Sequence, residues 1–140
     1  ISSLVSIVAS KRSVREALTA QQKELGVDGG LVAEGRDIGT AVFPDAEVKV
    51  FLTATEFARA KRRQIDLQER GFEVQSISDL TQQIRERDKL DSTREIAPLI
   101  KANDATELIT DGMNINEVID KVQDIFRDKI PESVWPTPLK

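Results

Sequence analysis

The sequence predicts an α/β domain in which a mostly parallel sheet is flanked by helices. Apolar, strand-like runs at 31–34, 48–52 and 105–110 are separated by segments with helical periodicity. Strands that alternate with helices are typical of parallel sheets that are covered on both faces. Ligands of such sheets bind beyond the carboxyl ends of the strands, so we expect the chemistry of this protein at that edge.

The amino-terminal part predicts one or two helices followed by two strands. Residues 1–25 carry apolar positions in a broken helical rhythm, and the glycine-rich turn at 26–30 ends it. The apolar run at 31–34 predicts a short strand. A Pro-Asp turn at 44–45 precedes the run at 48–52, which predicts the second and clearer strand.

Helices dominate the prediction for the rest of the domain. Thr53 and Glu56 have the spacing of a capping box and predict a helix of about four turns that ends at Gly71. A second helix is predicted from 78–79 to about 90, and a third strand at 105–110. The last helix shows the i, i+3, i+4, i+7 pattern of a helix facing a core. Its apolar positions are Ile115, Val118, Ile119, Val122, Ile125 and Phe126.

The chain is expected to form a single domain with a tail. A length of 140 residues with 39% apolar residues can build one core, and we assign 1–130 to that domain. The prolines in 131–140 predict an extended tail, in which Trp135 is expected to dock onto the domain or a partner.

Composition excludes several classes of function. The sequence contains no cysteine and no histidine, so a disulfide framework, a thiolate nucleophile, a Ser-His triad and a histidine metal site are absent from these residues. A net charge of −4 argues against a general binder of nucleic acid or anionic membranes. The sequence shows no membrane-spanning run and no secretory leader, which predicts a cytoplasmic protein.

The first candidate site is Glu34-Gly35-Arg36-Asp37-Ile38-Gly39-Thr40, directly after the first predicted strand. Two glycines let the backbone bend or approach a ligand closely, and the loop offers one cation and one anion. This combination suits a substrate with a phosphate and a polar base. The alternative is an ordinary surface turn, in which glycine and aspartate serve the backbone geometry and arginine serves solubility.

The second candidate site is Arg87, Asp91 and Arg94, spaced to share one side of a helix end. A guanidinium can hold two phosphate oxygens, and a carboxylate between two such groups fixes their orientation. A third, basic group lies on the capped helix: Arg59, Lys61, Arg62 and Arg63. For both groups the alternative is a solvated helix face, with ion pairs worth about 0.3 to 0.5 kcal/mol each.

A series of ordered blocks extends these motifs along the chain. The blocks are Val14-Arg15-Glu16-Ala17-Leu18, Glu34-Gly35-Arg36-Asp37-Ile38-Gly39-Thr40, Val42-Phe43-Pro44-Asp45-Ala46, Lys49-Val50-Phe51-Leu52-Thr53-Ala54, Arg62-Arg63-Gln64, Leu67-Gln68-Glu69-Arg70-Gly71-Phe72, Glu86-Arg87-Asp88, Asp91-Ser92-Thr93-Arg94 and Ala97-Pro98-Leu99. In these blocks the sequence closely resembles the bacterial cytidylate kinases, which are P-loop nucleoside monophosphate kinases. The resemblance extends to about residue 126 and leaves the tail outside.

The resemblance implies a pocket for the acceptor CMP. It implies that Asp37 reads the cytosine amino group and Arg36 the phosphate, that Ser6 also contacts the cytosine, and that Arg15 is a base-side or phosphate-side arginine. Cytosine offers a donor where uracil offers an acceptor, so a carboxylate can distinguish them. An unpaired buried carboxylate opposite uracil costs about 1 to 3 kcal/mol.

The resemblance also implies roles for the helical motifs. Asp91 would hold the sugar hydroxyls, while Arg87 and Arg94 would organise base and phosphates. Arg62 and Arg63 resemble lid arginines that close over the transferring phosphoryl group. Phosphoryl transfer needs in-line positioning and cations where charge spreads over the transferred oxygens, a task that arginines suit. A closed lid would exclude water and suppress ATP hydrolysis.

One part of the family pattern is missing from these residues. They contain no G-x-x-x-x-G-K-[ST] segment, so the phosphate loop, its lysine and its magnesium-binding hydroxyl are not present. We therefore expect residues 1–130 to be the carboxyl-terminal part of a cytidylate kinase domain, an incomplete fold that is marginally stable and inactive alone. ATP with Mg²⁺ is expected to bind upstream, and no metal site is expected among these residues.

The leading hypothesis is a monomeric transferase of pyrimidine metabolism that transfers the γ-phosphoryl of Mg-ATP to CMP or dCMP. One alternative is the kinase half of a fused pantoate ligase and cytidylate kinase. Another is a non-catalytic CMP-binding module without the phosphate loop. The last alternative is a purely structural α/β domain, which would bind no CMP.

Overall fold

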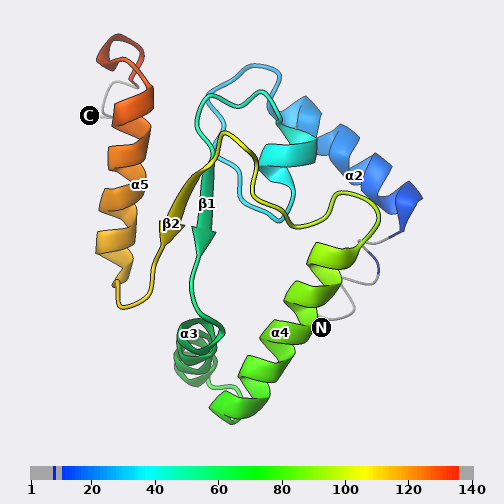
Figure 1. Ribbon diagram of the computed structural model, residues 1–140, viewed down its shortest axis with the longest axis vertical. Coiled ribbons are helices and arrows are strands. Elements are labelled where there is room, and N and C mark those ends of the chain that lie inside the picture. Colours follow the sequence, from blue (N-terminus) through cyan, green and yellow to red (C-terminus); the bar gives the residue numbers. More distant parts are fainter. Residues whose placement is uncertain (1–7, 9–10, 136–140) are drawn as a thin grey trace.

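The structure is a computed structural model that describes residue 8 and residues 11–135. Within them the sheet consists of strands β1 (Val50–Thr53) and β2 (Thr106–Ile109), which run parallel. Val50 lies opposite Thr106 and Thr53 opposite Ile109. The predicted parallel pairing is therefore confirmed, with α5 to one side of the strand pair and α2 to the other (Figure 1).

Helices α3 (Glu56–Glu69) and α4 (Ile77–Thr93) lie beyond the carboxyl ends of the strands (Figure 1). They pack on each other around a small core of Ala60, Leu80 and Ile84. Among the described residues Leu80 and Ala60 are fully buried. The two helices therefore form a packed unit next to the edge of the sheet where the site was predicted (Figure 1).

The ends of α3 and α4 follow local capping chemistry. Thr55 caps α3 by accepting a hydrogen bond from the Ala58 amide at 3.2 Å, and Ser76 caps α4 in the same way from Asp79. The predicted capping box at Thr53 and Glu56 was wrong, because Thr53 is still paired in β1. Gly71 follows α3 with φ +71°, as the predicted stop requires.

The strand predicted at 31–34 is absent, and this segment is an extended loop. Leu31 and Val32 are exposed, Val32 to 98%. A strand needs a hydrogen-bonded neighbour, and the described residues provide none beside this segment. The apolar pattern alone was therefore insufficient to make a strand.

The segments before β1 pack as helix and turn. Helix α2 (Arg12–Leu25) ends at Gly26 and lies against η1 (Ile38–Val42), a π-helical turn directly after Asp37. The part of the first predicted helical region at residues 1–7 and 9–10 lies outside the described residues. Because η1 follows Asp37 directly, it helps set where that carboxylate points.

Helix α5 (Ile115–Lys129) is well capped at its amino end but is little buried. Asn114 and Glu117 form a full capping box, yet no residue of α5 is buried. The predicted helix is confirmed, but the prediction that its apolar face meets a core is wrong for the described residues. Beyond it, η2 (Glu132–Val134) is a short 3-10 turn, so the predicted extended tail is wrong there. Trp135 docks on the end of α5, where its Nε1 donates to the Ile130 carbonyl at 2.8 Å.

Candidate functional site

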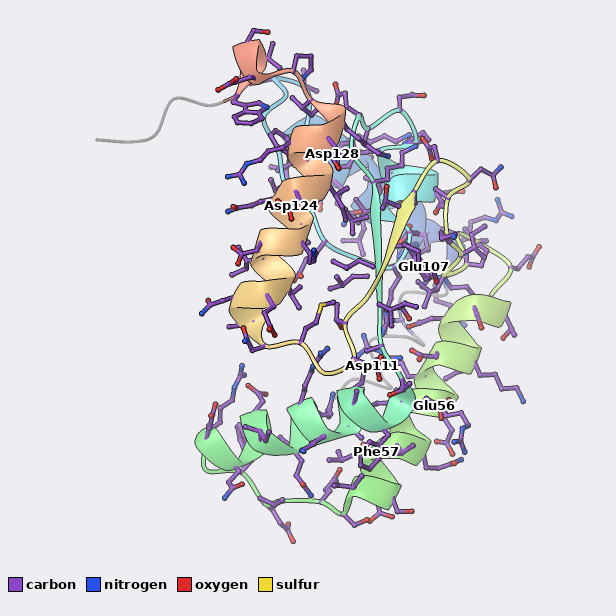
Figure 2. The ribbon with its side chains drawn as sticks, turned by 60° about the vertical axis from the view of Figure 1, so that its left-hand side comes forward. Glu56, Phe57, Glu107, Asp111, Asp124 and Asp128 are labelled. Atoms are coloured by element: carbon purple, nitrogen blue, oxygen red, sulfur yellow. The ribbon has the colours of Figure 1, made fainter. Side chains whose placement is uncertain are left out.

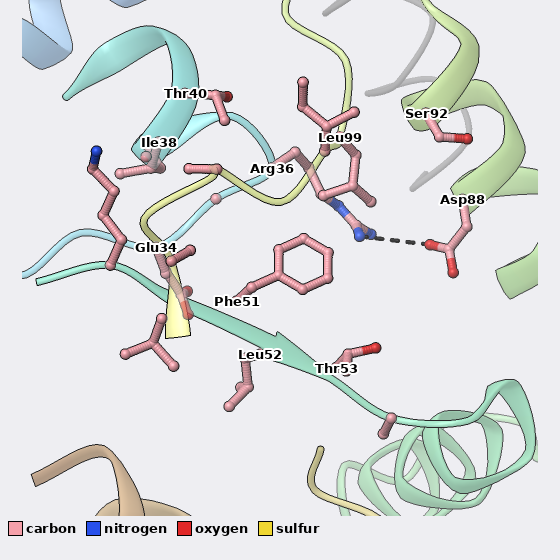
Figure 3. Close-up of a pocket in the computed structure, with 18 of the residues that line it drawn as sticks. Glu34, Arg36, Ile38, Thr40, Phe51, Leu52, Thr53, Asp88, Ser92 and Leu99 are labelled. Atoms are coloured by element: carbon pink, nitrogen blue, oxygen red, sulfur yellow. Dashed lines mark ion pairs between the residues drawn. The ribbon is translucent and has the colours of Figure 1, made fainter. Parts of the chain in front are cut away.

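A cavity of about 810 Å³ opens at the carboxyl end of β1. The loop at 34–40, β1, α3 and α4 supply its walls (Figure 3). Gly35 allows a close approach within this loop, because a Cβ there would lie 2.7 Å from Ile38 Cγ1. The cavity brings Arg36, Arg59 and Asp88 beside β1, and the expectation that the chemistry lies at this edge of the sheet stays a prediction.

Asp37 is buried between two arginines. Its Oδ2 is paired with Arg15 from α2, and its Oδ1 lies 3.4 Å from Arg94 at the end of α4. The Asp37 residue is only 4% exposed. Three segments far apart in sequence therefore meet at one carboxylate.

Asp91, on α4, is likewise surrounded by arginines. Its Oδ2 lies 3.2 Å from Arg36 Nε and 3.7 Å from Arg87 Nε, and its Oδ1 lies 3.8 Å from Arg94. Asp91 is 3% exposed. Arg94 thus bridges Asp37 and Asp91, and its Nε also donates to the Ala97 carbonyl at 2.6 Å.

Asp88 joins a further arginine to this group. It forms a two-point contact with Arg59 of α3, with Oδ1 at 3.0 Å from Nη2, and lies 3.5 Å from Arg36 Nη1 (Figure 3). We call the whole set the arginine–aspartate network. Its members are Arg15, Arg36, Arg59, Arg87, Arg94, Asp37, Asp88 and Asp91. It carries an excess of two positive charges in a chain whose net charge is −4.

The electrostatics of the network favour an anion. Burial lowers the pKa of Arg15, and the neighbouring Arg94 adds to this effect. Burial also lowers the pKa of Arg36, with Arg87 as the next cause. Arginine stays protonated despite such shifts, so these cations are held close together at a desolvation cost. A bound phosphate would offset that cost.

Three buried atoms of the network lack a hydrogen bond within the described residues. They are Arg15 Nε, Arg87 Nε and Asp91 Oδ2. Buried polar atoms are usually paired, and an unpaired one needs a reason. Asp91 Oδ2 contacts Arg36 and Arg87 only through ion pairs, so these atoms and Arg15 Nε keep hydrogen-bonding capacity for a ligand with phosphate oxygens and hydroxyl groups.

A second cavity, of about 560 Å³, lies between α3 and α4. Arg63 lines it together with Arg36, Arg59 and Arg87. Arg62 also borders it, but its guanidinium donates to the Thr110 carbonyl and, at 2.9 Å, to the Thr110 hydroxyl. The two predicted lid arginines therefore differ, since Arg62 ties α3 to the end of β2.

The structure brings together six of the predicted substrate residues: Arg15, Arg36, Asp37, Arg87, Asp91 and Arg94. Ser6 lies outside the described residues. Asp88 also belongs to the network, although the motifs indicated no role for it, and they indicated no specific role for Arg59. Asp88 precedes Asp91 by three positions, so helical spacing alone could have placed it on the same face.

Neither a metal-binding cluster nor a membrane-spanning helix occurs within the described residues. No group of three or more acidic side chains there is placed to hold a metal ion. No helix in that part of the chain combines the length and hydropathy needed to cross a bilayer.

Parallel strands, flanking helices and a cluster of arginines around buried aspartates define an α/β protein with a cation-rich candidate site. The chain belongs to the cytidylate kinase family, whose model matches residues 1–128.

The similar proteins are bifunctional and much longer. The chain is 69% identical over 137 residues to a bifunctional pantoate ligase/cytidylate kinase of Prochlorococcus marinus strain SARG, a match that covers 98% of this chain and 26% of that protein. A protein with the same name from Synechococcus sp. strain CC9311 is 62% identical over 139 residues, covering 99% of this chain and 28% of that protein. The chain thus spans about a quarter of the length of these curated relatives.

Proposed function

We propose that the protein containing this chain transfers the γ-phosphoryl group of ATP to CMP or dCMP, giving CDP or dCDP and ADP. A phosphate oxygen of the acceptor attacks the γ-phosphorus, and the bond to the bridging oxygen of ADP breaks. The observation that carries the proposal is the buried arginine–aspartate network at the strand ends, in a chain of the cytidylate kinase family.

The base end of the acceptor is assigned to Asp37, with Arg15 and Arg94 beside it. Ser6 is assigned to the cytosine by the family resemblance alone. Each oxygen of Asp37 accepts from one arginine, and a carboxylate oxygen has two lone pairs. One acceptor position therefore remains for the amino group of cytosine. Two arginines also supply the counter-charge for this buried carboxylate, so it can serve as a selective acceptor.

The phosphate and sugar are assigned to the other end of the network. Arg36 and Arg87 both face Asp91, and their excess positive charge suits the acceptor phosphate. The Asp91 oxygen that lacks a hydrogen bond suits a sugar hydroxyl. The network would then bind one nucleotide along its length.

The transferring group is assigned to the arginines of α3. Arg62 and Arg63 both line the second cavity and are the candidates for lid residues. We propose that Mg²⁺ arrives with ATP and supplies charge neutralisation of its phosphates. The contribution of this chain is to orient the acceptor, exclude water and place cations around the reacting oxygens.

A second candidate function follows from the relatives. Their names describe a bifunctional pantoate ligase/cytidylate kinase, and this chain covers about a quarter of them. We propose that the kinase described here is one half of such a fused enzyme. As an enzyme that consumes ATP and CMP it would act in the cytoplasm, and the kinase half is proposed to be monomeric.

The proposal is tested on the product of the complete reading frame. We expect turnover of CMP with Mg-ATP and much weaker turnover of UMP. In Asp37→Asn the amide can accept from cytosine or donate to uracil, so the ratio of kcat/KM for CMP over UMP should fall roughly 5- to 150-fold, the equivalent of about 1 to 3 kcal/mol. Asp124→Asn removes an exposed carboxylate of α5 and is the matched control.

Three results would contradict this assignment. CMP binding without any turnover would indicate a non-catalytic CMP-binding module. The absence of both binding and turnover would indicate a structural domain. An unchanged CMP preference in a folded Asp37→Asn variant would remove Asp37 from reading the base.

A further inference from the structure

Asp88 is a carboxylate of the site that the family resemblance did not assign to a task. It lies on α4, with its side chain 28% exposed, and lines the larger cavity. It contacts two guanidinium groups: Arg59 from α3 and Arg36 from the loop that carries Asp37. One carboxylate therefore connects three separate segments.

The two arginines that Asp88 holds have a special position. Arg36 and Arg59 each line both the larger cavity and the second cavity between α3 and α4. They thus stand at the border between the two spaces. A phosphate bound at this border would meet both cations.

Holding two like charges at one border requires a counter-charge. The pKa of Arg59 is raised chiefly by its hydrogen bond with Asp88, so the pair stabilises the charged guanidinium. Asp91 also pairs with Arg36, at 3.2 Å, but does not contact Arg59 in the described structure. Without Asp88, Arg59 would lose its two-point contact and could turn away from Arg36.

We propose that Asp88 is a positioning residue that holds the guanidinium groups of Arg36 and Arg59 together at the place where the acceptor phosphate binds. This inference rests on the proposed function for the identity of the acceptor. It predicts that Asp88 strengthens phosphate binding although its own charge repels an anion.

The competing explanation is that Asp88 only braces α3 against α4. The chain offers a matched control for this explanation in Glu56 of α3, which pairs with Arg85 of α4 at 2.6 Å. Both pairs connect the same two helices through an arginine and a carboxylate. Glu56→Gln removes the same charge as Asp88→Asn. Glu56 forms no ion pair with Arg36 in the described structure, and it acts on Arg59 only through a weaker Coulomb interaction than the hydrogen-bonded Asp88.

The test measures binding of CMP and of cytidine to the product of the complete reading frame by calorimetry. The dissociation constant of cytidine divided by that of CMP reports what the phosphate contributes. In Asp88→Asn we expect this ratio to fall about 10-fold, because the phosphate would lose part of its charge-assisted hydrogen bonding to the two guanidinium groups. In Glu56→Gln we expect it to stay within about 2-fold.

The sign of the change separates positioning from simple electrostatics. Asp88→Asn raises the net charge of the site by one, so Coulomb attraction alone would increase the contribution of the phosphate. A ratio that rises or stays the same in Asp88→Asn therefore overturns the inference. Equal losses of CMP and cytidine binding also overturn it, since they indicate a brace.

A second variant protects the test against misfolding. Arg59→Lys keeps both charges but replaces the two-point contact with a single ammonium, and the dissociation constant of cytidine divided by that of CMP should again fall. If Asp88→Asn does not fold, an unchanged ratio in Arg59→Lys overturns the inference.

Failure of this inference is distinguishable from failure of the proposed function. Wild-type protein that binds CMP in an Asp88-dependent way but does not turn it over contradicts the kinase proposal alone. Normal CMP turnover with an unchanged ratio in Asp88→Asn contradicts the inference alone. Wild-type protein that does not bind CMP contradicts both.

Discussion

The arginine–aspartate network and the apolar face of α5 reverse the usual rule of burial. Asp37 and Asp91 are 4% and 3% exposed, whereas Ile115 and Ile119 on α5 are 75% and 47% exposed. Figure 2 shows α5, which carries Asp124 and Asp128, standing apart from α3 and α4. Buried charge thus lies in one region and exposed apolar surface in the other.

The two regions are therefore under different physical constraints. Burying carboxylates costs several kcal/mol unless cations and hydrogen bonds compensate, so a buried ionic group is weak evidence for stability and better evidence for a function. The α5 pattern identifies which face is apolar, but not what will cover that face.

Removing Asp91 should have the largest effect. In Asp91→Ala the partly buried arginines Arg36, Arg87 and Arg94 lose a shared, buried counter-charge, and such a loss costs about 3 to 5 kcal/mol. Denaturant unfolding of the product of the complete reading frame measures it. Asp124→Ala, at an exposed ion pair, should change the free energy of unfolding by less than about 1 kcal/mol. Equal effects would show that the network is not buried as described.

Apolar truncations sharpen the comparison from the other side. Leu80 is fully buried between α3 and α4, so Leu80→Ala should destabilise by about 2 to 5 kcal/mol. Ile115→Ala on α5 should cost about 0.5 kcal/mol or less, because that side chain is 75% exposed. A large loss in Ile115→Ala would mean that another part of the protein covers this face.

The turn that follows the network stores backbone strain. Ala97 has φ +49°, in the left-handed region that glycine tolerates better, and its carbonyl accepts from Arg94 Nε. Ala97→Gly should stabilise the fold by about 0.5 kcal/mol, since the relieved strain exceeds the added freedom of the unfolded chain. Thermal unfolding detects this as a small rise in Tm. A fall in Tm would show that the turn is not strained.

The smallest effect concerns Asp111, which accepts from the Thr55 amide at 2.9 Å and from its hydroxyl at the start of α3, near Glu56 (Figure 2). These bonds hold the pKa of Asp111 below its usual 3.8. The stabilisation is therefore complete above that value and is lost as pH falls through the lower pKa of the folded state. The Tm difference between wild type and Asp111→Asn should shrink toward pH 2. A difference independent of pH would contradict this account.

Local chemistry made several elements predictable. The glycine stop at Gly71, the amphipathic run at 115–126 and the β-rich run at 48–52 correspond to α3, α5 and β1. Helical spacing also placed Arg87, Asp91 and Arg94 on one side of α4. Each of these depends on residues a few positions apart, whose relation the backbone period determines.

The errors in the prediction share a physical cause. The segment 31–34 has a strand pattern but no neighbouring strand among the described residues, and Thr53 has the capping spacing but is held in β1. In both cases a partner distant in sequence decided the outcome. Asp88 was assigned no task for the same reason, since its partners Arg36 and Arg59 lie 52 and 29 positions away.

The sequence by itself determined the alternation of helices and strands, the family and the residue types of the site, because these depend on local periods and ordered motifs. Only the tertiary structure decided that Asp37 joins Arg15 to Arg94, that the Arg62 guanidinium bonds Thr110, and that α5 keeps an open apolar face. Charges and apolar faces select their partners across space, after the chain has folded, and a pattern within one segment carries no record of that choice.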